Sequence, residues 1–197
     1  MILSRDFLRR AKTQFAYESY DNYHKRVFYE NHALYTKYSR FDIFLSHSYL
    51  DRDEVLSLVH LFNTCNYAVY VDWLYDGQLD RTCVSMETAA LLRIRMDQSR
   101  GLAFLVTSNS TNSKWCPWEL GYFDGKSNKS RCCILPVLSH SLFDNYQGQE
   151  FLGLYPYLQY EKYAHIDAYD FWVFEQNSSK YISLRAWLTG NDPIEHE

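Results

Sequence analysis

The pattern of hydrophobic and polar positions divides the chain into a helical N-terminal part and a middle part in which predicted strands and helices alternate. Residues 4–37 contain no Gly or Pro. Apolar residues recur in this stretch at helical spacing, first at Leu8, Ala11 and Phe15 and then at Tyr20, Tyr23 and Val27. The pattern predicts a helix or a helix pair, rich in aromatic residues, that packs either on the following domain or on another subunit.

Short, continuously apolar runs begin after Phe41 and alternate with helical stretches. The runs are Ile43–Leu45, Tyr67–Val71, Leu102–Val106 and Ile134–Leu138, with a weaker one at Tyr157–Tyr160. Such runs fit strands that are buried on both faces of a parallel sheet. Two stripes at helical spacing lie between them: Val55, Leu58, Val59 and Phe62, then Ala89, Leu92 and Met96 in a helix from near Met86. The alternation predicts a doubly wound α/β domain.

A third, short helix is expected to begin near Ser113. Ser113 is a suitable N-cap, and Pro117 matches the preference for proline in a first turn. This helix would carry Glu119. The tail is less regular, and we expect one final helix near Ser179–Leu188.

The composition suits one ordinary domain. The chain has 197 residues, and 47% of them are hydrophobic, which is enough to build a core. A formal charge of -4 and the lack of a basic run argue against nucleic acid as a partner. Aromatic residues make up 18% of the chain, which indicates an unusually aromatic core or surfaces that stack on flat ligands or partner proteins.

The cysteines and the apolar runs indicate the compartment. Five cysteines form an odd set without a CxxC motif or the Cys/His spacing of a zinc site, so we interpret them as reduced thiols of a cytosolic protein. Residues 1–10 lack the apolar core of a secretory signal. Apolar runs such as Cys132–Leu138 fall far below the roughly 20 residues that span a bilayer. We therefore expect a cytoplasmic protein without a membrane partner.

Candidate chemistry follows the predicted strands at their carboxyl ends. In open α/β sheets, ligands bind beyond these ends, where the strand order reverses. If the first and third predicted strands flank that reversal, the loops Ser46–Asp53 and Thr107–Lys114 line one crevice. The first loop offers hydroxyls, the His47 imidazole and the Asp51 carboxylate. The same residues also fit a helix N-cap with a solvated histidine.

The second predicted strand leads into Asp72–Arg81, a stretch that combines aromatic rings, carboxylates and one arginine. Such a loop can stack a flat ring, and the Arg81 guanidinium suits phosphate oxygens. The alternative is a surface loop that contains an Asp80–Arg81 charge pair.

The third element combines aromatic residues with one carboxylate. Trp115, Trp118, Glu119 and Tyr122 follow the i, i+3, i+4, i+7 spacing of one helical face. A carboxylate among large rings loses hydration unless it is paired, which favours a role as acid, base or charge stabiliser. The alternative is an aromatic core stripe with Glu119 at its edge, bonded to a backbone amide or an arginine.

Several common enzyme classes lack their motifs in this sequence. A Gly-rich dinucleotide fingerprint and a P-loop are both missing, which disfavours a Rossmann dehydrogenase and a P-loop nucleotidase. A nucleophile pair of Cys116 and His47 has no supporting motif.

Three separated motifs resemble the Toll/interleukin-1 receptor (TIR) domain family, specifically its bacterial, NAD-consuming members. The motifs are Phe41–His47, similar to the family's first box, Tyr70–Arg81, in the place of its BB loop, and Ser113–Leu120, similar to its Trp-x-x-x-Glu helix. The resemblance implies a flavodoxin-like α/β fold with a five-stranded parallel sheet and helices on both faces. It divides the chain into an N-terminal helical extension (1–39), a TIR domain (40–165) and a C-terminal helical segment (166–197) packed on that domain.

The resemblance also implies roles for single residues. Glu119 holds the position of the glutamate that supports cleavage of the nicotinamide–ribose bond in the enzymatic members. The residues implied to line or close the NAD⁺ pocket are Ser46, His47, Asp72, Trp73, Arg81 and Trp115. NAD⁺ enters as the substrate, and neither a metal nor a further cofactor is expected.

The implied reaction yields nicotinamide and a linear, cyclic or conjugated ADP-ribose product. Short bacterial TIR proteins of this kind resemble the Thoeris-like synthases of antiviral defence, whose product signals to a separate effector protein, and self-association through the TIR domain is expected. Two alternatives remain open. One is a non-enzymatic TIR–TIR interaction scaffold. The other is an enzyme like the nucleoside deoxyribosyltransferases, which also use a carboxylate at a ribosyl carbon.

Overall fold

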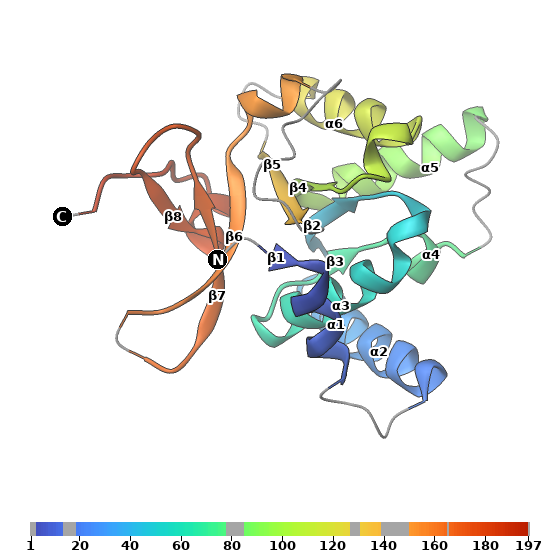
Figure 1. Ribbon diagram of the computed structural model, residues 1–197. Helices are drawn as coiled ribbons and strands as arrows, with labels where there is room; N and C mark the ends of the chain where they lie inside the picture. The colour runs from blue at the N-terminus through green and yellow to red at the C-terminus, as the bar shows by residue number, and fades with distance from the viewer. Residues whose placement is uncertain are drawn as a thin grey trace.

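The computed structural model describes residues 3–13, 19–77, 85–126, 131–138, 150–164 and 166–196 (Figure 1). The strands are β1 (Leu3–Ser4), β2 (Phe41–Ser46), β3 (Val69–Tyr70), β4 (Ser99–Val106), β5 (Cys132–Leu138), β6 (Tyr157–Lys162), β7 (Tyr169–Phe174) and β8 (Tyr181–Ser183). The helices are α1 (Arg5–Thr13), α2 (Tyr20–Tyr38), α3 (Arg52–Thr64), α4 (Asp72–Tyr75), α5 (Met86–Asp97), α6 (Trp115–Gly125) and α7 (Leu184–Leu188). Three 3₁₀ turns are η1 (Tyr49–Asp51), η2 (Ser110–Asn112) and η3 (Glu150–Leu154). The predicted alternation of strands and helices is confirmed.

The strands form one mixed sheet in the order β3-β2-β4-β5-β6-β7-β8. Neighbouring strands from β3 through β6 are parallel, whereas β7 and β8 run antiparallel to their neighbours. The chain makes β2 before β3 and β4, yet β2 lies between them in the sheet. The strand order therefore reverses between β2 and β4, the first and third of the predicted strands.

The sheet is larger than the expected five strands. Off the main strand order, β1 pairs in parallel with the end of β5, with Leu3 opposite Val137. Beyond β6, β7 and β8 continue the sheet to its edge.

The expectation of a C-terminal segment that is helical throughout is wrong, because this segment contains β7 and β8. The final helix expected near Ser179–Leu188 is confirmed only for α7, which begins at Leu184. Aromatic and β-branched residues such as Trp172 and Val173 favour a strand that can pair with the open edge of β6.

Helices cover both faces of the central strands (Figure 1). On one side α1 and α2 both contact α3, so the N-terminal helix pair packs on the domain of its own chain. On the other side α5 and α6 contact each other and β4. None of the helices described here combines the length and hydrophobicity of a bilayer span.

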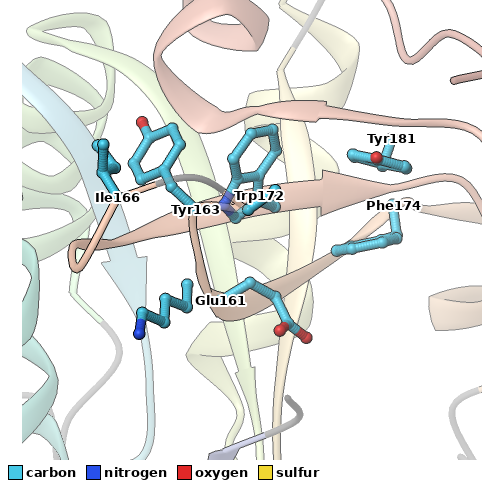
Figure 2. A pocket seen from close by; sticks show the side chains of 8 residues that line it. Glu161, Tyr163, Ile166, Trp172, Phe174 and Tyr181 are labelled. Carbon is cyan, nitrogen blue, oxygen red and sulfur yellow. The ribbon is translucent and has the colours of Figure 1, made fainter.

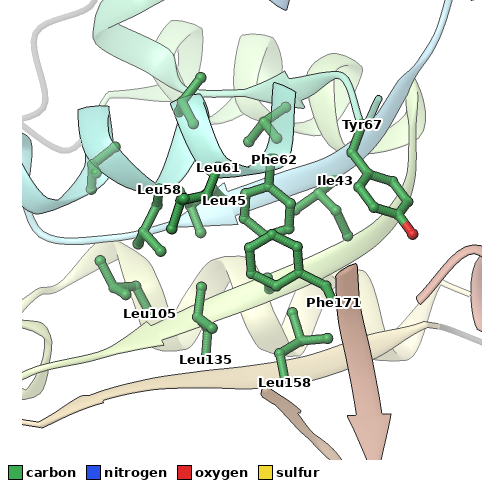
Figure 3. Packing of buried hydrophobic residues seen from close by; sticks show 14 of the residues in the cluster. Ile43, Leu45, Leu58, Leu61, Phe62, Tyr67, Leu105, Leu135, Leu158 and Phe171 are labelled. Atoms are coloured by element: carbon green, nitrogen blue, oxygen red, sulfur yellow. The ribbon is translucent and has the colours of Figure 1, made fainter. Parts of the chain in front are cut away.

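The core has two apolar clusters, one on each face of the sheet. Ile43 and Leu45 of β2 belong to the cluster beneath α3, whereas Phe44 belongs to the cluster beneath α5 and α6. Figure 3 shows the first cluster, in which the ring of Phe62 from α3 stacks on that of Phe171 from β7 with 3.9 Å between centroids. The C-terminal strands are thus part of the main core.

Asn31 of α2 closes the edge of the sheet at β3. Its side chain pairs with both backbone groups of Val69, because Nδ2 donates to the carbonyl at 2.5 Å and Oδ1 accepts from the amide at 2.7 Å. Asn31 is fully buried. The side chain replaces the hydrogen bonds that a further strand would make, so α2 protects an otherwise open edge.

Candidate active site

Ser46 and Glu119 meet at the carboxyl end of β2. The Ser46 hydroxyl donates a hydrogen bond to the Glu119 carboxylate, with 2.6 Å between Oγ and Oε2, and both residues are fully buried. Side chains alternate along a strand, so Ser46 points to the same face as Phe44, the face that α6 covers. The loops after the first and third predicted strands therefore approach each other as expected.

The helix that carries Glu119 begins where the sequence predicts. The Ser113 hydroxyl accepts a hydrogen bond from the Cys116 amide at 3.3 Å, and Pro117 lies in the first turn of α6. A capped start fixes the direction of a short helix. Glu119 follows within the second turn and is thereby aimed at the end of β2.

The aromatic residues of α6 divide between the interior and the surface. Trp115 is buried and meets Trp118 edge to face, with centroids 5.4 Å apart. Trp118 also stacks on Tyr122, and the Arg93 guanidinium of α5 lies over both rings. Glu119 is fully buried, so it does not lie at an exposed edge of the aromatic stripe.

His47 lies within a hydrogen-bonded cluster. Its Nδ1 is 2.8 Å from the Leu45 carbonyl oxygen, and its Nε2 accepts from the Trp73 indole nitrogen at 3.0 Å. Asp72 Oδ1 is 3.5 Å from the same Nε2. The imidazole is only 2% exposed, so the alternative of a solvated histidine is wrong, although Ser48 does cap the following η1 turn.

The stretch predicted as a loop after β3 starts with a short helix, α4. Asp76, just beyond it, is held by Arg95 of α5 at 2.8 and 2.9 Å and by the Tyr70 hydroxyl at 2.8 Å. Burial, together with the Asp76 carboxylate, raises the pKa of Tyr70. These contacts fix the beginning of the predicted loop. Arg81 and Asp80 lie outside the described residues.

The expected site residues thus form two groups around the end of β2. Ser46 and Glu119 lie on the α6 side. His47, Asp72 and Trp73 form the second group, and the Trp73 ring also lies against His24 of α2, with 5.5 Å between centroids. Sequence reasoning missed the part played by the N-terminal helices here, and the aromatic density of α2 was the only available signal.

Comparison with known proteins places the chain in a family. No family model matches it. A curated protein of Bacillus cereus (strain MSX-D12), the "Probable 3' cyclic ADP-D-ribose synthase ThsB'", is 44% identical over 167 residues, which is 85% of each chain. This chain belongs to the ThsB' family.

A second relative matches over part of the chain. The "Putative cyclic ADP-D-ribose synthase TIR2" of Cytobacillus dafuensis is 37% identical to this ThsB' family member over 95 residues, 48% of this chain and 25% of that protein. Both relatives are named as cyclic ADP-D-ribose synthases. The name TIR2 also agrees with the resemblance of the three sequence motifs to the TIR domain family.

Among the residues with a described position, no group of three or more His, Cys, Asp or Glu side chains is arranged to hold a metal ion. Cys116 is buried in the apolar cluster beneath α6, whereas the His47 ring contacts Trp73.

A cavity of about 520 Å³ lies on the C-terminal strands of this ThsB' family member (Figure 2). Its aromatic walls are Tyr163, Trp172, Phe174 and Tyr181. Trp172 alternates with the buried Phe171 and Val173 along β7, so the cavity is on the face away from the core. None of its lining residues was expected in the active site.

Proposed function

We propose that this ThsB' family member cleaves the nicotinamide–ribose bond of NAD⁺ through the carboxylate of Glu119. The observation that carries the proposal is the buried Ser46–Glu119 pair, which lies at the reversal of strand order where ligands bind in open α/β sheets. The names of both relatives support it, because cyclic ADP-D-ribose corresponds to the ADP-ribose part of NAD⁺ closed on itself.

The reaction needs a negative group close to the ribose. When the bond between ribose C1′ and the nicotinamide nitrogen breaks, its electron pair leaves with the nitrogen and neutral nicotinamide departs. Positive charge then develops on C1′ and the ring oxygen, and the Glu119 carboxylate stabilises this oxocarbenium-like centre. A hydroxyl of the same nucleotide forms the new bond to C1′, loses one proton and yields a cyclic product. Water in its place yields linear ADP-ribose.

The other expected residues surround the nucleotide in this proposal. Trp115 shapes the pocket beside Glu119, while His47, Asp72 and Trp73 contact the nucleotide from the side of α2. Arg81 binds phosphate oxygens, a role that rests on the family resemblance. NAD⁺ is the substrate, and no additional cofactor takes part.

Access to Glu119 is part of the proposed reaction. The carboxylate is fully buried, so contact with the ribose requires side chains around it to rearrange. The Ser46 hydroxyl donates a hydrogen bond to Oε2 of Glu119 and has to share this oxygen with the ribose or release it.

The proposed cellular role rests on the resemblance to the TIR family. The product acts as a signal to a separate effector protein in antiviral defence, and the chain associates with itself through its TIR domain in the cytoplasm.

Mass spectrometry of the products after incubation with NAD⁺ tests the proposal. We expect nicotinamide and an equal amount of a nucleotide that is one water lighter than ADP-ribose. A non-enzymatic scaffold would release no nicotinamide at any protein concentration. An enzyme like the deoxyribosyltransferases would convert free nucleosides and leave NAD⁺ intact. Either of these results would overturn the proposal.

A further inference from the structure

Asp51 lies where three segments of the chain meet. Its Oδ2 accepts from the Thr107 hydroxyl at 2.6 Å, and its Oδ1 accepts from Asn109 Nδ2 at 2.6 Å and from Arg5 Nη2 at 3.2 Å. The Asp51 side chain is fully buried. One carboxylate therefore joins the β2–α3 connection, the β4–α6 connection and the start of α1.

The two connections that Asp51 joins are the ones that carry the proposed active-site pair. Ser46 ends β2 just before the first connection, and the second leads into α6, which bears Glu119. The relative placement of Ser46 and Glu119 is therefore restrained twice, by their own hydrogen bond and by Asp51.

The β4–α6 connection transmits this restraint because its turn is internally bonded. The Thr107 hydroxyl accepts from the amides of Asn109 and Ser110, at 3.1 and 3.2 Å. The Ser110 hydroxyl in turn accepts from the Thr107 amide at 3.0 Å and donates to its carbonyl at 2.9 Å. Displacing Thr107 from Asp51 would therefore loosen the whole turn that precedes α6.

The N-terminal segment holds Arg5 in place from both sides. Ser4, immediately before it, pairs with Leu138 at the end of β5, and Leu8 is buried one turn later. Arg5 Nε also lies 3.8 Å from Glu54. A buried carboxylate needs a counter-charge or several donors to offset its lost hydration. Arg5 supplies the cation.

We infer that Arg5 is a positioning residue of the active site, which acts through Asp51 to hold Ser46 and Glu119 in their relative positions. The inference rests on the proposed NAD⁺ reaction. It makes the first turn of α1, which lies outside the family's core motifs, a functional part of the catalytic unit.

Nicotinamide release by point variants tests the inference. In Arg5→Ala we expect kcat to fall about tenfold, because a charge-assisted hydrogen bond is lost, while KM for NAD⁺ stays within about twofold. Arg5→Lys keeps the charge and should recover most of the loss. Arg9→Ala is the matched control, since Arg9 lies exposed on the same helix. An Arg5→Ala enzyme with the kcat of the wild type would overturn the inference.

A double variant tests whether Arg5 acts through Asp51. Asp51→Asn should lower kcat at least as far as Arg5→Ala. Adding Arg5→Ala to Asp51→Asn should then cause no further loss, because both changes break one network. Additive losses would show that Arg5 acts elsewhere and would contradict the inference.

Amide hydrogen exchange separates this inference from the proposed reaction. In Arg5→Ala the amides of Asn109 and Ser110 should exchange about tenfold faster than in the wild type and in Arg9→Ala, since the Asp51 carboxylate that anchors their acceptor on Thr107 loses its counter-charge. Wild-type protein that releases no nicotinamide would refute the proposed function alone. Unchanged exchange in Arg5→Ala would refute the connection from Arg5 to the turn.

Discussion

The Ser46 hydroxyl lies 2.6 Å from the Glu119 carboxylate and joins the end of β2 to α6 inside the protein. Burying a carboxylate is costly unless hydrogen-bond donors replace the water that it loses. Because Ser46 is one such donor, we expect the pair to affect both the stability of the fold and the proposed reaction.

Replacing Ser46 by alanine should destabilise the protein. Ser46→Ala removes a buried donor to a carboxylate, which costs about 1–3 kcal/mol of unfolding free energy. Urea denaturation measures this loss. Ser178→Ala, in an exposed turn, serves as the control. Equal stability of the two variants would show that the buried hydrogen bond contributes nothing.

His47 should adopt one tautomer. The Leu45 carbonyl can only accept, and the Trp73 indole can only donate, so the neutral ring carries its proton on Nδ1. The 3.5 Å approach of Asp72 to Nε2 would need the proton there instead, and the shorter Trp73 contact decides against it. Long-range ¹H–¹⁵N NMR should show the Nδ1–H form in the wild type and a loss of this preference in Trp73→Phe. An Nε2–H wild-type ring would contradict the arrangement.

Asn31 should stabilise the fold through the edge of the sheet. Asn31→Ala leaves the amide and the carbonyl of Val69 buried without their present partner, at a cost of about 2–5 kcal/mol. Chemical denaturation against Asn22→Ala, an exposed position on the same helix, gives the comparison. If Asn31→Ala lowers the unfolding free energy no more than Asn22→Ala does, water or another group must form the hydrogen bonds to the backbone of Val69.

Cys65 should resist alkylation in the folded protein. Burial raises the pKa of its thiol from 9.0 to about 12, so the reactive thiolate is scarce at pH 8. Its alkylation by iodoacetamide should keep rising about tenfold per pH unit beyond pH 9, where an exposed thiol levels off. Site-resolved mass spectrometry measures the rates, with urea-unfolded protein as the control. A plateau near pH 9 in the folded state would contradict the shift.

Much of the central fold could be predicted from local patterns. Ile43 to Leu45 form a short buried run, and parallel pairing with crossover helices then limits the possible arrangements. The approach of Ser46 to Glu119 follows from the same pattern, because Ser46 ends β2 and Glu119 lies on the helix that follows β4.

Other parts depend on contacts that no local pattern contains. β1 has only two residues, and Arg5 reaches Asp51 across 46 positions of sequence. Local pattern does not predict β7, because a single polar residue, Asp170, precedes four apolar ones, and so short an apolar run fits a buried helix segment equally well. Its strand form depends on pairing with β6 and on stacking against Phe62. The role of Asn31 likewise arises only when α2 meets the sheet.

The most direct test of the central claim is the rate of nicotinamide release from NAD⁺ by the wild type and by Glu119→Gln. Glutamine keeps the size and an acceptor for Ser46 but removes the carboxylate charge. We expect the rate to fall by about a hundredfold or more, as it does when electrostatic stabilisation of a transition state is lost. Circular dichroism should show an intact fold, and Glu87→Gln, exposed on α5, should retain full activity. Turnover by folded Glu119→Gln equal to that of the wild type would contradict the role assigned to this carboxylate.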